Sequence, residues 1–142
     1  MKLIFRQKML SLLDAFDVYG EDGNIAYKVK SELAIGHKMK IFSSQGDEIG
    51  EVRQKVISVT PTFELYERGK KIGGIKKKLF KLFGSEYSID SLGWTAKGNF
   101  TEWNYSIQDS NGNLVATIGK QLLNLTDTYV LDIVNPQHAL HV

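Results

Sequence analysis

The sequence contains no cysteine, only two prolines and no long apolar run in its 142 residues. Without cysteine there is no disulfide framework, no thiolate nucleophile and no cysteine-bound zinc or iron–sulfur cluster. The absence of cysteine fits a reducing compartment. The apolar start is interrupted by Arg6, Lys8 and Asp14 before any small-residue cleavage site. We therefore expect neither an export signal nor a transmembrane helix. We expect a cytoplasmic location.

Recognisable catalytic and cofactor motifs are also missing. There is no Gly-x-Ser-x-Gly elbow, and the Gly73-Gly74 pair lacks the spacing of a phosphate-binding loop. His138 and His141 lie three residues apart without a nearby third ligand, and His37 is typical of a surface turn. We expect a non-catalytic domain with no cofactor and no metal.

The composition is that of a globular protein, with 42% hydrophobic and 24% charged residues. A chain of this length buries roughly two thirds of the surface that its unfolded form exposes, so one core is sufficient. We interpret residues 1–142 as a single domain.

Glycine recurs at intervals of 23, 23, 24 and 19 residues. Most of these glycines have Asp or Asn beside them, and such pairs between apolar runs predict hairpin turns because glycine reaches positive φ angles. The predicted turn glycines are Gly23, Gly46, Gly69, Gly93 and Gly112.

Apolar residues between the turns alternate with polar ones, the pattern of a strand with one buried face. Ile25 and Val29 are examples, and residues 56–60 show the same alternation and end at Pro61, which predicts a strand that stops there. We expect Trp94 and Trp103 to supply core area.

A repeat accompanies the turns. Six residues after Gly23, Gly69 and Gly112 comes a β-branched residue that we expect to face inward, namely Val29, Ile75 and Ile118. Many short antiparallel strands leave exposed edges unless the sheet closes or pairs with a second sheet, so the alternatives are a barrel and a sandwich. We favour the barrel.

Helical signals are few. We predict a strand rather than a helix near residue 3, whereas Asn135 and Pro136 form a good helix start. Only residues 137–142 follow it.

Taken together, four segments resemble the LURP-one-related family, whose fold is shared with the tubby C-terminal domain and phospholipid scramblases. They are FRQKMLSL from Phe5, QKVISVTPTFE from Gln54, KGNFTEWNYSI from Lys97 and TDTYVL from Thr126. The resemblance implies an all-β, closed antiparallel β-barrel of about twelve strands around one apolar C-terminal helix. That helix is largely absent from this chain, so we expect the natural protein to continue with it beyond Val142. If it does not, we expect a large apolar cavity, a collapsed barrel, or a partner's segment inserted where the helix would run.

The basic segment is the strongest functional lead. It carries seven cations and no acid between positions 68 and 85: Arg68, Lys70, Lys71, Lys76, Lys77, Lys78 and Lys81. Tubby-like domains bind phosphoinositides, and a lysine cluster flanked by apolar residues suits an acidic membrane surface. The hypothesis is a peripheral module that binds anionic phospholipid headgroups.

The alternative is a structural or protein-interaction domain whose lysines solvate a hairpin and keep strand edges apart. Nucleic acid is not expected as a partner, because the chain has only three arginines for base edges, Arg6, Arg53 and Arg68.

Overall fold

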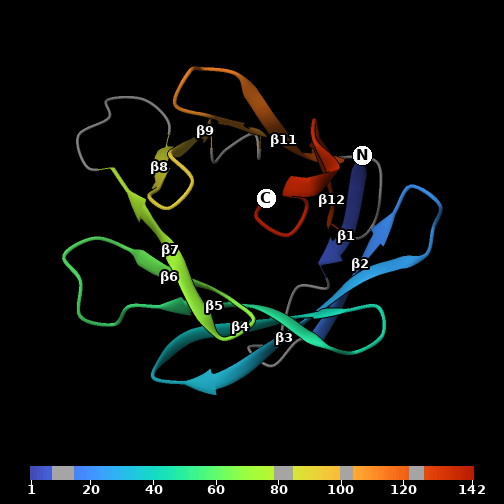
Figure 1. The fold of residues 1–142 in the computed structure, drawn as a ribbon, viewed down its shortest axis with the longest axis horizontal. Helices are drawn as coiled ribbons and strands as arrows, with labels where there is room; N and C mark the ends of the chain where they lie inside the picture. Colours follow the sequence, from blue (N-terminus) through green and yellow to red (C-terminus); the bar gives the residue numbers. More distant parts are fainter. Residues whose placement is uncertain (8–14, 79–84, 100–103, 122–126) are drawn as a thin grey trace.

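The computed structural model describes residues 1–7, 15–78, 85–99, 104–121 and 127–142. These residues form strands and one short 3₁₀ turn (Figure 1). The elements are β1 (Lys2–Gln7), β2 (Ala15–Gly20), β3 (Ile25–Ala34), β4 (Gly36–Ser43), β5 (Glu48–Gln54), β6 (Thr62–Glu67), β7 (Lys70–Lys77), β8 (Ser85–Ile89), β9 (Trp94–Asn99), β10 (Asn104–Gln108), β11 (Leu114–Gln121), β12 (Asp127–Ile133) and η1 (Pro136–His138).

The strands follow one another around a closed antiparallel barrel, and β1 completes it by pairing with β12. In that seam Leu3 lies opposite Leu131, and the N-terminal ammonium donates a hydrogen bond of 3.1 Å to the Ile133 carbonyl. Among the described strands, closure leaves no edge for another chain to pair with. The expectation of an all-β barrel of about twelve strands is confirmed.

The predicted turn glycines lie in the tight connections of the barrel. Gly23, Gly46, Gly69 and Gly112 have φ angles between 77° and 99°, and each joins two antiparallel neighbours. Gly93, with a φ of 64°, lies between β8 and β9. The hairpin interpretation of these five positions is confirmed, and it sets the register of the strands on either side.

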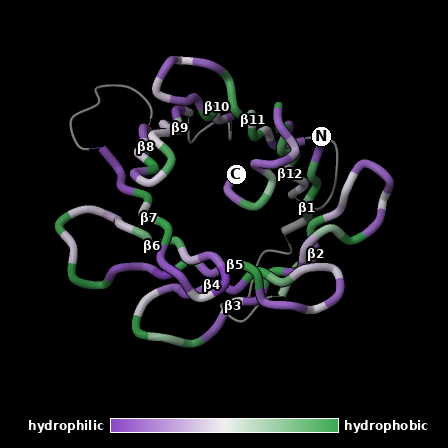
Figure 2. Tube along the Cα trace, in the orientation of Figure 1, coloured by the Kyte–Doolittle hydropathy of each residue, from purple (hydrophilic) through white to green (hydrophobic). Residues whose placement is uncertain are grey.

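The inward face of the strands forms one apolar core. Val29 is buried in it, and Ile75 and Ile118 pack against it, as the repeat predicts. Trp94 is 6% exposed and belongs to the same core, whereas Trp103 lies outside the described residues. Figure 2 shows hydrophobic and hydrophilic positions mixed along the strands, because alternate side chains face opposite sides of the sheet.

The carboxy-terminal segment turns into the ring of strands, and the C-terminus lies within that ring in Figure 1. Its capping signal works as predicted: the Asn135 side chain accepts a hydrogen bond of 3.0 Å from the Gln137 N–H. The result is the 3₁₀ turn η1 rather than an α-helix, after which Ala139 and Val142 pack against the core.

One strand prediction is wrong. Residues 56–60, whose alternation predicts a half-buried strand, form the connection between β5 and β6 and have no strand partner. Ladder pairing of β5 with β6 ends at Gln54 and Phe63, so the alternating residues extend past the sheet into solvent. At the start of the chain, β1 confirms the strand interpretation as far as Gln7, and residues 8–14 lie outside the described part.

Candidate functional site

The basic segment occupies the β6–β7 turn and the whole of β7. Arg68 and Lys70 are exposed at the turn. Lys76, Lys77 and Lys78, here named the lysine triplet, lie at the other end of the strand. Six residues of strand separate Lys71 from Lys77, about 20 Å at about 3.3 Å per residue. The segment is therefore divided between the two ends of the barrel, and Lys81 lies outside the described residues.

Carboxylates from the neighbouring strands accompany part of the segment. Lys71 pairs with Glu64, and the hydrogen bond from Lys71, followed by one from the Tyr66 hydroxyl, lowers the pKa of Glu64. In the lysine triplet the Nζ atom of Lys76 lies 3.0 Å from Asp90, and that of Lys78 lies 2.6 Å from Glu86. The side chains of Lys76 and Lys78 are still 56% and 47% exposed, so both remain accessible to an external anion.

The lysine triplet adjoins the β5–β6 loop. The Lys77 N–H donates a hydrogen bond of 3.3 Å to the Pro61 carbonyl, and Lys76 lies opposite Thr62 in the ladder. On the other side of the loop the Lys55 N–H donates to the Thr62 carbonyl over 2.8 Å. Lys55 is exposed and has no ion pair among the described residues, so it adds a cation to this end of the barrel.

The β3–β4 turn meets the β5–β6 loop at the same end. The His37 N–H donates a hydrogen bond of 3.0 Å to Oε1 of Gln54, and a Cβ at Gly36 would lie 2.9 Å from Val56 Cγ2. Both connections lie toward the lower left of the view in Figure 1. Loop and turn therefore form one surface, although 20 residues separate His37 from Ile57 in the sequence.

This shared surface exposes branched aliphatic side chains. They are named the apolar tip and comprise Leu33 (81% exposed), Ile35 (88%), Val56 (53%), Ile57 (91%) and Val59 (99%). The described chain exposes three further large hydrophobic residues, Met1, Leu114 and Val134, which lie at the opposite ends of their strands. The two connections are thus the main apolar surface of the described residues.

An open hollow of about 570 Å³ lies at the base of the apolar tip. Met39 and Phe63 contribute apolar surface to its wall, and Lys38, paired with Glu32, contributes polar surface.

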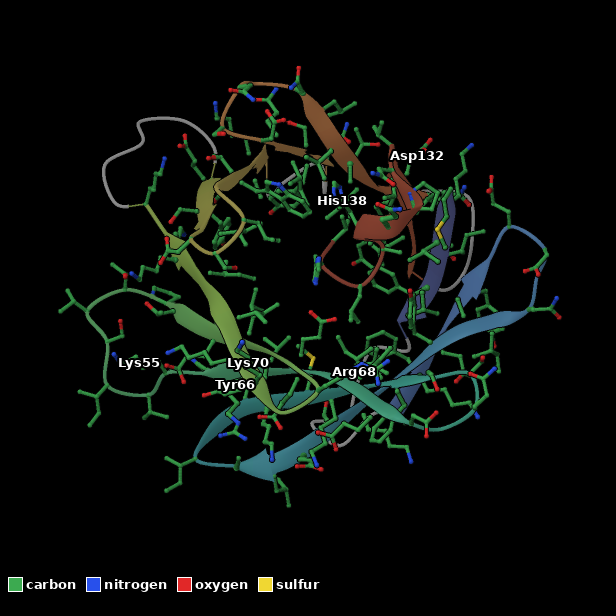
Figure 3. All side chains as sticks on the ribbon, viewed as in Figure 1. Lys55, Tyr66, Arg68, Lys70, Asp132 and His138 are labelled. Atoms are coloured by element: carbon green, nitrogen blue, oxygen red, sulfur yellow. The ribbon has the colours of Figure 1, made fainter. Side chains whose placement is uncertain are left out.

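The other half of the basic segment borders a different hollow, of about 750 Å³, at the β6–β7 turn. Arg68 and Lys70 line it, as does His141, whose Nε2 lies 3.2 Å from the Glu67 carboxylate. Figure 3 labels Arg68 and Lys70 near the middle of the view and Lys55 farther toward the left edge. Arg68 and Lys70 form no ion pair within the described ranges.

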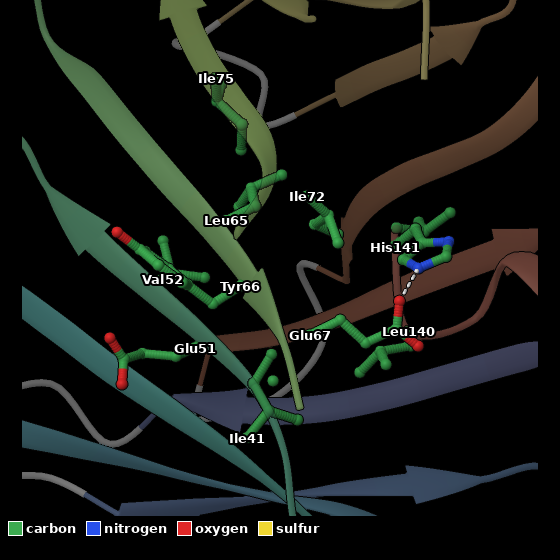
Figure 4. Close-up of a pocket in the computed structure, with 12 residues that line it drawn as sticks. Ile41, Glu51, Val52, Leu65, Tyr66, Glu67, Ile72, Ile75, Leu140 and His141 are labelled. Carbon is green, nitrogen blue, oxygen red and sulfur yellow. Dashed lines mark hydrogen bonds and ion pairs between the residues drawn. The ribbon is translucent and has the colours of Figure 1, made fainter. Parts of the chain in front are cut away.

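Inside the barrel an apolar cavity of about 150 Å³ lies beside the carboxy-terminal segment (Figure 4). Aliphatic residues from four strands and from the end of the chain line it: Ile41, Val52, Leu65, Ile72, Ile75, Leu140 and Val142. A cavity of this size is comparable to engineered apolar cavities that bind benzene.

The histidines have structural neighbours. His138 packs edge-on against Trp94, with 5.0 Å between the ring centroids, and His141 contacts Glu67. Over the described ranges no three histidine, aspartate or glutamate side chains gather closely enough to hold a metal ion. Nor do those ranges contain a helix of the length and apolarity needed to cross a membrane.

Sequence reasoning found the lysine triplet and missed the apolar tip. The signal was present in residues 56–60, but alternating apolar residues are equally typical of a strand with a buried face. Lys55 was missed because it lies 13 residues before Arg68 and comes near the triplet through the pairing of β5 with β6 and of β6 with β7.

Comparison with known proteins places the chain in a family. The family model described as LURP-one-related matches residues 1–140. A protein of Bacillus subtilis (strain 168) called uncharacterized protein YxjI is 26% identical over 140 residues, which cover 98% of this chain and 85% of that protein. The X-ray structure of an Arabidopsis thaliana protein matches with a TM-score of 0.66 at 14% identity, covering 99% of this chain and 85% of that chain. At that identity the structural match supports the fold alone.

Proposed function

The chain belongs to the LURP-one-related family, and from that premise we propose that it is a non-catalytic, peripheral domain that binds anionic phospholipid headgroups through the lysine triplet. Family membership establishes the barrel and leaves its ligand open, because a shared fold does not carry a function with it. The proposal therefore depends on the charges and on where the barrel presents them.

The observation that supports the proposal is a concentration of lysines beside two connections that contain no acid, at one end of the barrel. Residues 33–38 and 54–62 contain no aspartate or glutamate of their own, and the lysine triplet borders them through the Lys77–Pro61 hydrogen bond. Lys55 adds an exposed cation, whereas Lys38 is neutralised by Glu32, 2.8 Å away. An anionic membrane attracts such a surface, and each basic residue near it contributes about 1 kcal/mol. Asp90 and Glu86 reduce this attraction, because they pair with Lys76 and Lys78.

The test is vesicle co-sedimentation of two charge-matched variants. One carries Lys76→Gln, Lys77→Gln and Lys78→Gln, and the other carries Arg68→Gln, Lys70→Gln and Lys71→Gln at the opposite end of β7. Glutamine avoids placing a new carboxylate beside Glu86. Vesicles contain phosphatidylcholine alone, phosphatidylcholine with phosphatidylserine in equal parts, or phosphatidylcholine with a phosphatidylinositol phosphate.

The triplet variant should bind acidic vesicles at least about tenfold more weakly, and up to somewhat more than a hundredfold if each lysine contributes the full value of about 1 kcal/mol. The Arg68 variant, with the same net charge, should bind like the wild type. High salt should weaken wild-type binding, because exposed charges are screened. Equal losses in both variants would indicate attraction by net charge alone, and no binding of the wild type to acidic vesicles would refute the function in favour of the protein-interaction alternative.

A further inference from the structure

We propose that the apolar tip inserts into the bilayer, so that the domain anchors to an acidic membrane by the β3–β4 turn and the β5–β6 loop. The inference rests on the proposed function and extends it, because headgroup attraction alone requires no penetration of the acyl region. The partner of this surface is the bilayer, at the boundary between its headgroups and its acyl chains.

Exposure provides the first argument. Ile57 and Val59 are 91% and 99% exposed, although both are branched aliphatic residues that normally contribute to cores. Clustered apolar side chains at a projecting end mark an interaction surface, whereas single exposed ones need no explanation. Three further aliphatic residues of the apolar tip extend the cluster across both connections.

The construction of the β5–β6 loop provides the second argument. Polar groups in the loop bond to one another: the Thr62 hydroxyl donates to the Thr60 carbonyl over 3.0 Å, and the Ser58 and Thr62 hydroxyls lie 3.0 Å apart. These bonds hold the loop in a shape that leaves the apolar side chains of Ile57 and Val59 exposed. The backbone N–H groups of residues 56–60 donate no hydrogen bond to another described residue, so the loop suits the hydrated boundary of the bilayer, where water and headgroups satisfy them, rather than the acyl interior.

The charge around the apolar tip favours an acidic bilayer, rather than a second copy of the chain, as the partner of this surface. Lys55 and the lysine triplet border the apolar tip, and the two connections themselves contain no acid. Asp90 and Glu86 pair with Lys76 and Lys78, whose side chains remain about half exposed. Acidic headgroups are complementary to these lysines while the aliphatic side chains pass between them, whereas two identical tips would bring the same cations together.

The test removes apolar side chains from each end of the barrel without changing charge. The tip variant carries Ile57→Ser and Val59→Ser, and the matched control carries Leu114→Ser and Val134→Ser, which alter exposed residues at the opposite ends of their strands. Binding is measured on vesicles of phosphatidylcholine and phosphatidylserine in equal parts. Far-UV circular dichroism checks that both variants fold.

Insertion predicts that the tip variant partitions about tenfold more weakly, because two buried side chains are lost from the bilayer, while the control stays close to the wild type. A second variant, Ile57→Trp, reports how deeply the loop enters the bilayer. The fluorescence of the introduced tryptophan should shift to the blue on acidic vesicles and be quenched by lipids brominated on the acyl chains. These readouts do not respond to adsorption at the headgroups alone.

The outcomes separate this inference from the proposed function. If the lysine-triplet variant loses binding while the tip variant does not, or if brominated chains leave the added fluorescence of the Ile57→Trp variant unchanged, headgroup binding stands and insertion is refuted. If the wild type binds no acidic vesicles, both are refuted. Concentration-dependent dimers by light scattering that disappear in the tip variant, without vesicle binding, would assign the surface to self-association instead.

Discussion

Gly112 forms the β10–β11 turn with a φ of 84°, and a Cβ built there would meet nothing within 4 Å. Space is therefore not the constraint at this residue; the backbone conformation is. A side chain in the left-handed region costs about 1–2 kcal/mol for most L-residues. We predict that Gly112→Ala lowers the free energy of unfolding by about that amount, measured by urea denaturation.

Gly50 provides the control for that substitution. It lies in β5 without a positive φ, and a Cβ there would be in ordinary contact with Ile41 and Leu140 at 3.4–3.5 Å. Gly50→Ala should therefore be close to neutral. If Gly112→Ala and Gly50→Ala lower the free energy of unfolding by the same amount, the turn conformation is not what requires glycine at position 112.

At the scale of elements, ion pairs connect the outer faces of β3, β4 and β5. Glu32 lies 2.8 Å from Lys38 and 3.4 Å from Lys40, and Lys40 also lies 2.9 Å from Glu48. The hydrogen bond from Lys38, followed by the bond from Lys40, lowers the pKa of Glu32 below its ordinary value. All three strands are thus coupled through exposed charges rather than through core packing alone.

This coupling predicts a pH dependence. A carboxylate with a lowered folded-state pKa stabilises the protein above its unfolded pKa, about 4.3 for glutamate, and that contribution is lost as the pH falls through the folded value. The stability difference between the wild type and Glu32→Gln should therefore be present at neutral pH and shrink as the pH falls below about 4. Urea denaturation of both proteins across this range measures it. A difference that stays constant down to low pH would assign the effect of the substitution to something other than charge.

At the scale of the whole molecule, closure makes the first and last strands depend on each other. Ile133, 1% exposed, ends β12 in the core, and its N–H donates a hydrogen bond to the Met1 carbonyl. We predict that Ile133→Ala costs about 2–5 kcal/mol, the usual range for such a deletion in a packed core. The transitions followed by tryptophan fluorescence and by circular dichroism should shift together, because a closed barrel has no edge at which to unfold in part.

The neighbouring residue tests that prediction. Val134 is 64% exposed, and Val134→Ala should change stability by no more than about 0.5 kcal/mol. A larger effect at position 134 than at position 133, or separate transitions for the two probes, would contradict a single cooperative barrel.

The sequence by itself determined what depends on local conformation and on period. Turn glycines such as Gly23 and Gly69 were predictable because only glycine adopts their φ angles cheaply, and inward positions such as Val29 followed from the alternation between turns. The Asn135 cap was predictable for the same reason, since its hydrogen bond spans two residues. The pattern of short strands favoured a barrel over a sandwich, and the family resemblance supplied the strand number of about twelve.

Only the tertiary structure decided which residues meet and which remain exposed. The basic segment is continuous in sequence, yet extended backbone carries its two halves to opposite ends of the barrel, and pairing of β5 with β6 brings Lys55 to the lysine triplet instead. Residues 56–60 have the alternation of a buried strand but become exposed because the ladder ends before them. Alternation records which side chains share a face, whereas a neighbouring strand is required to cover that face, and its presence depends on long-range pairing.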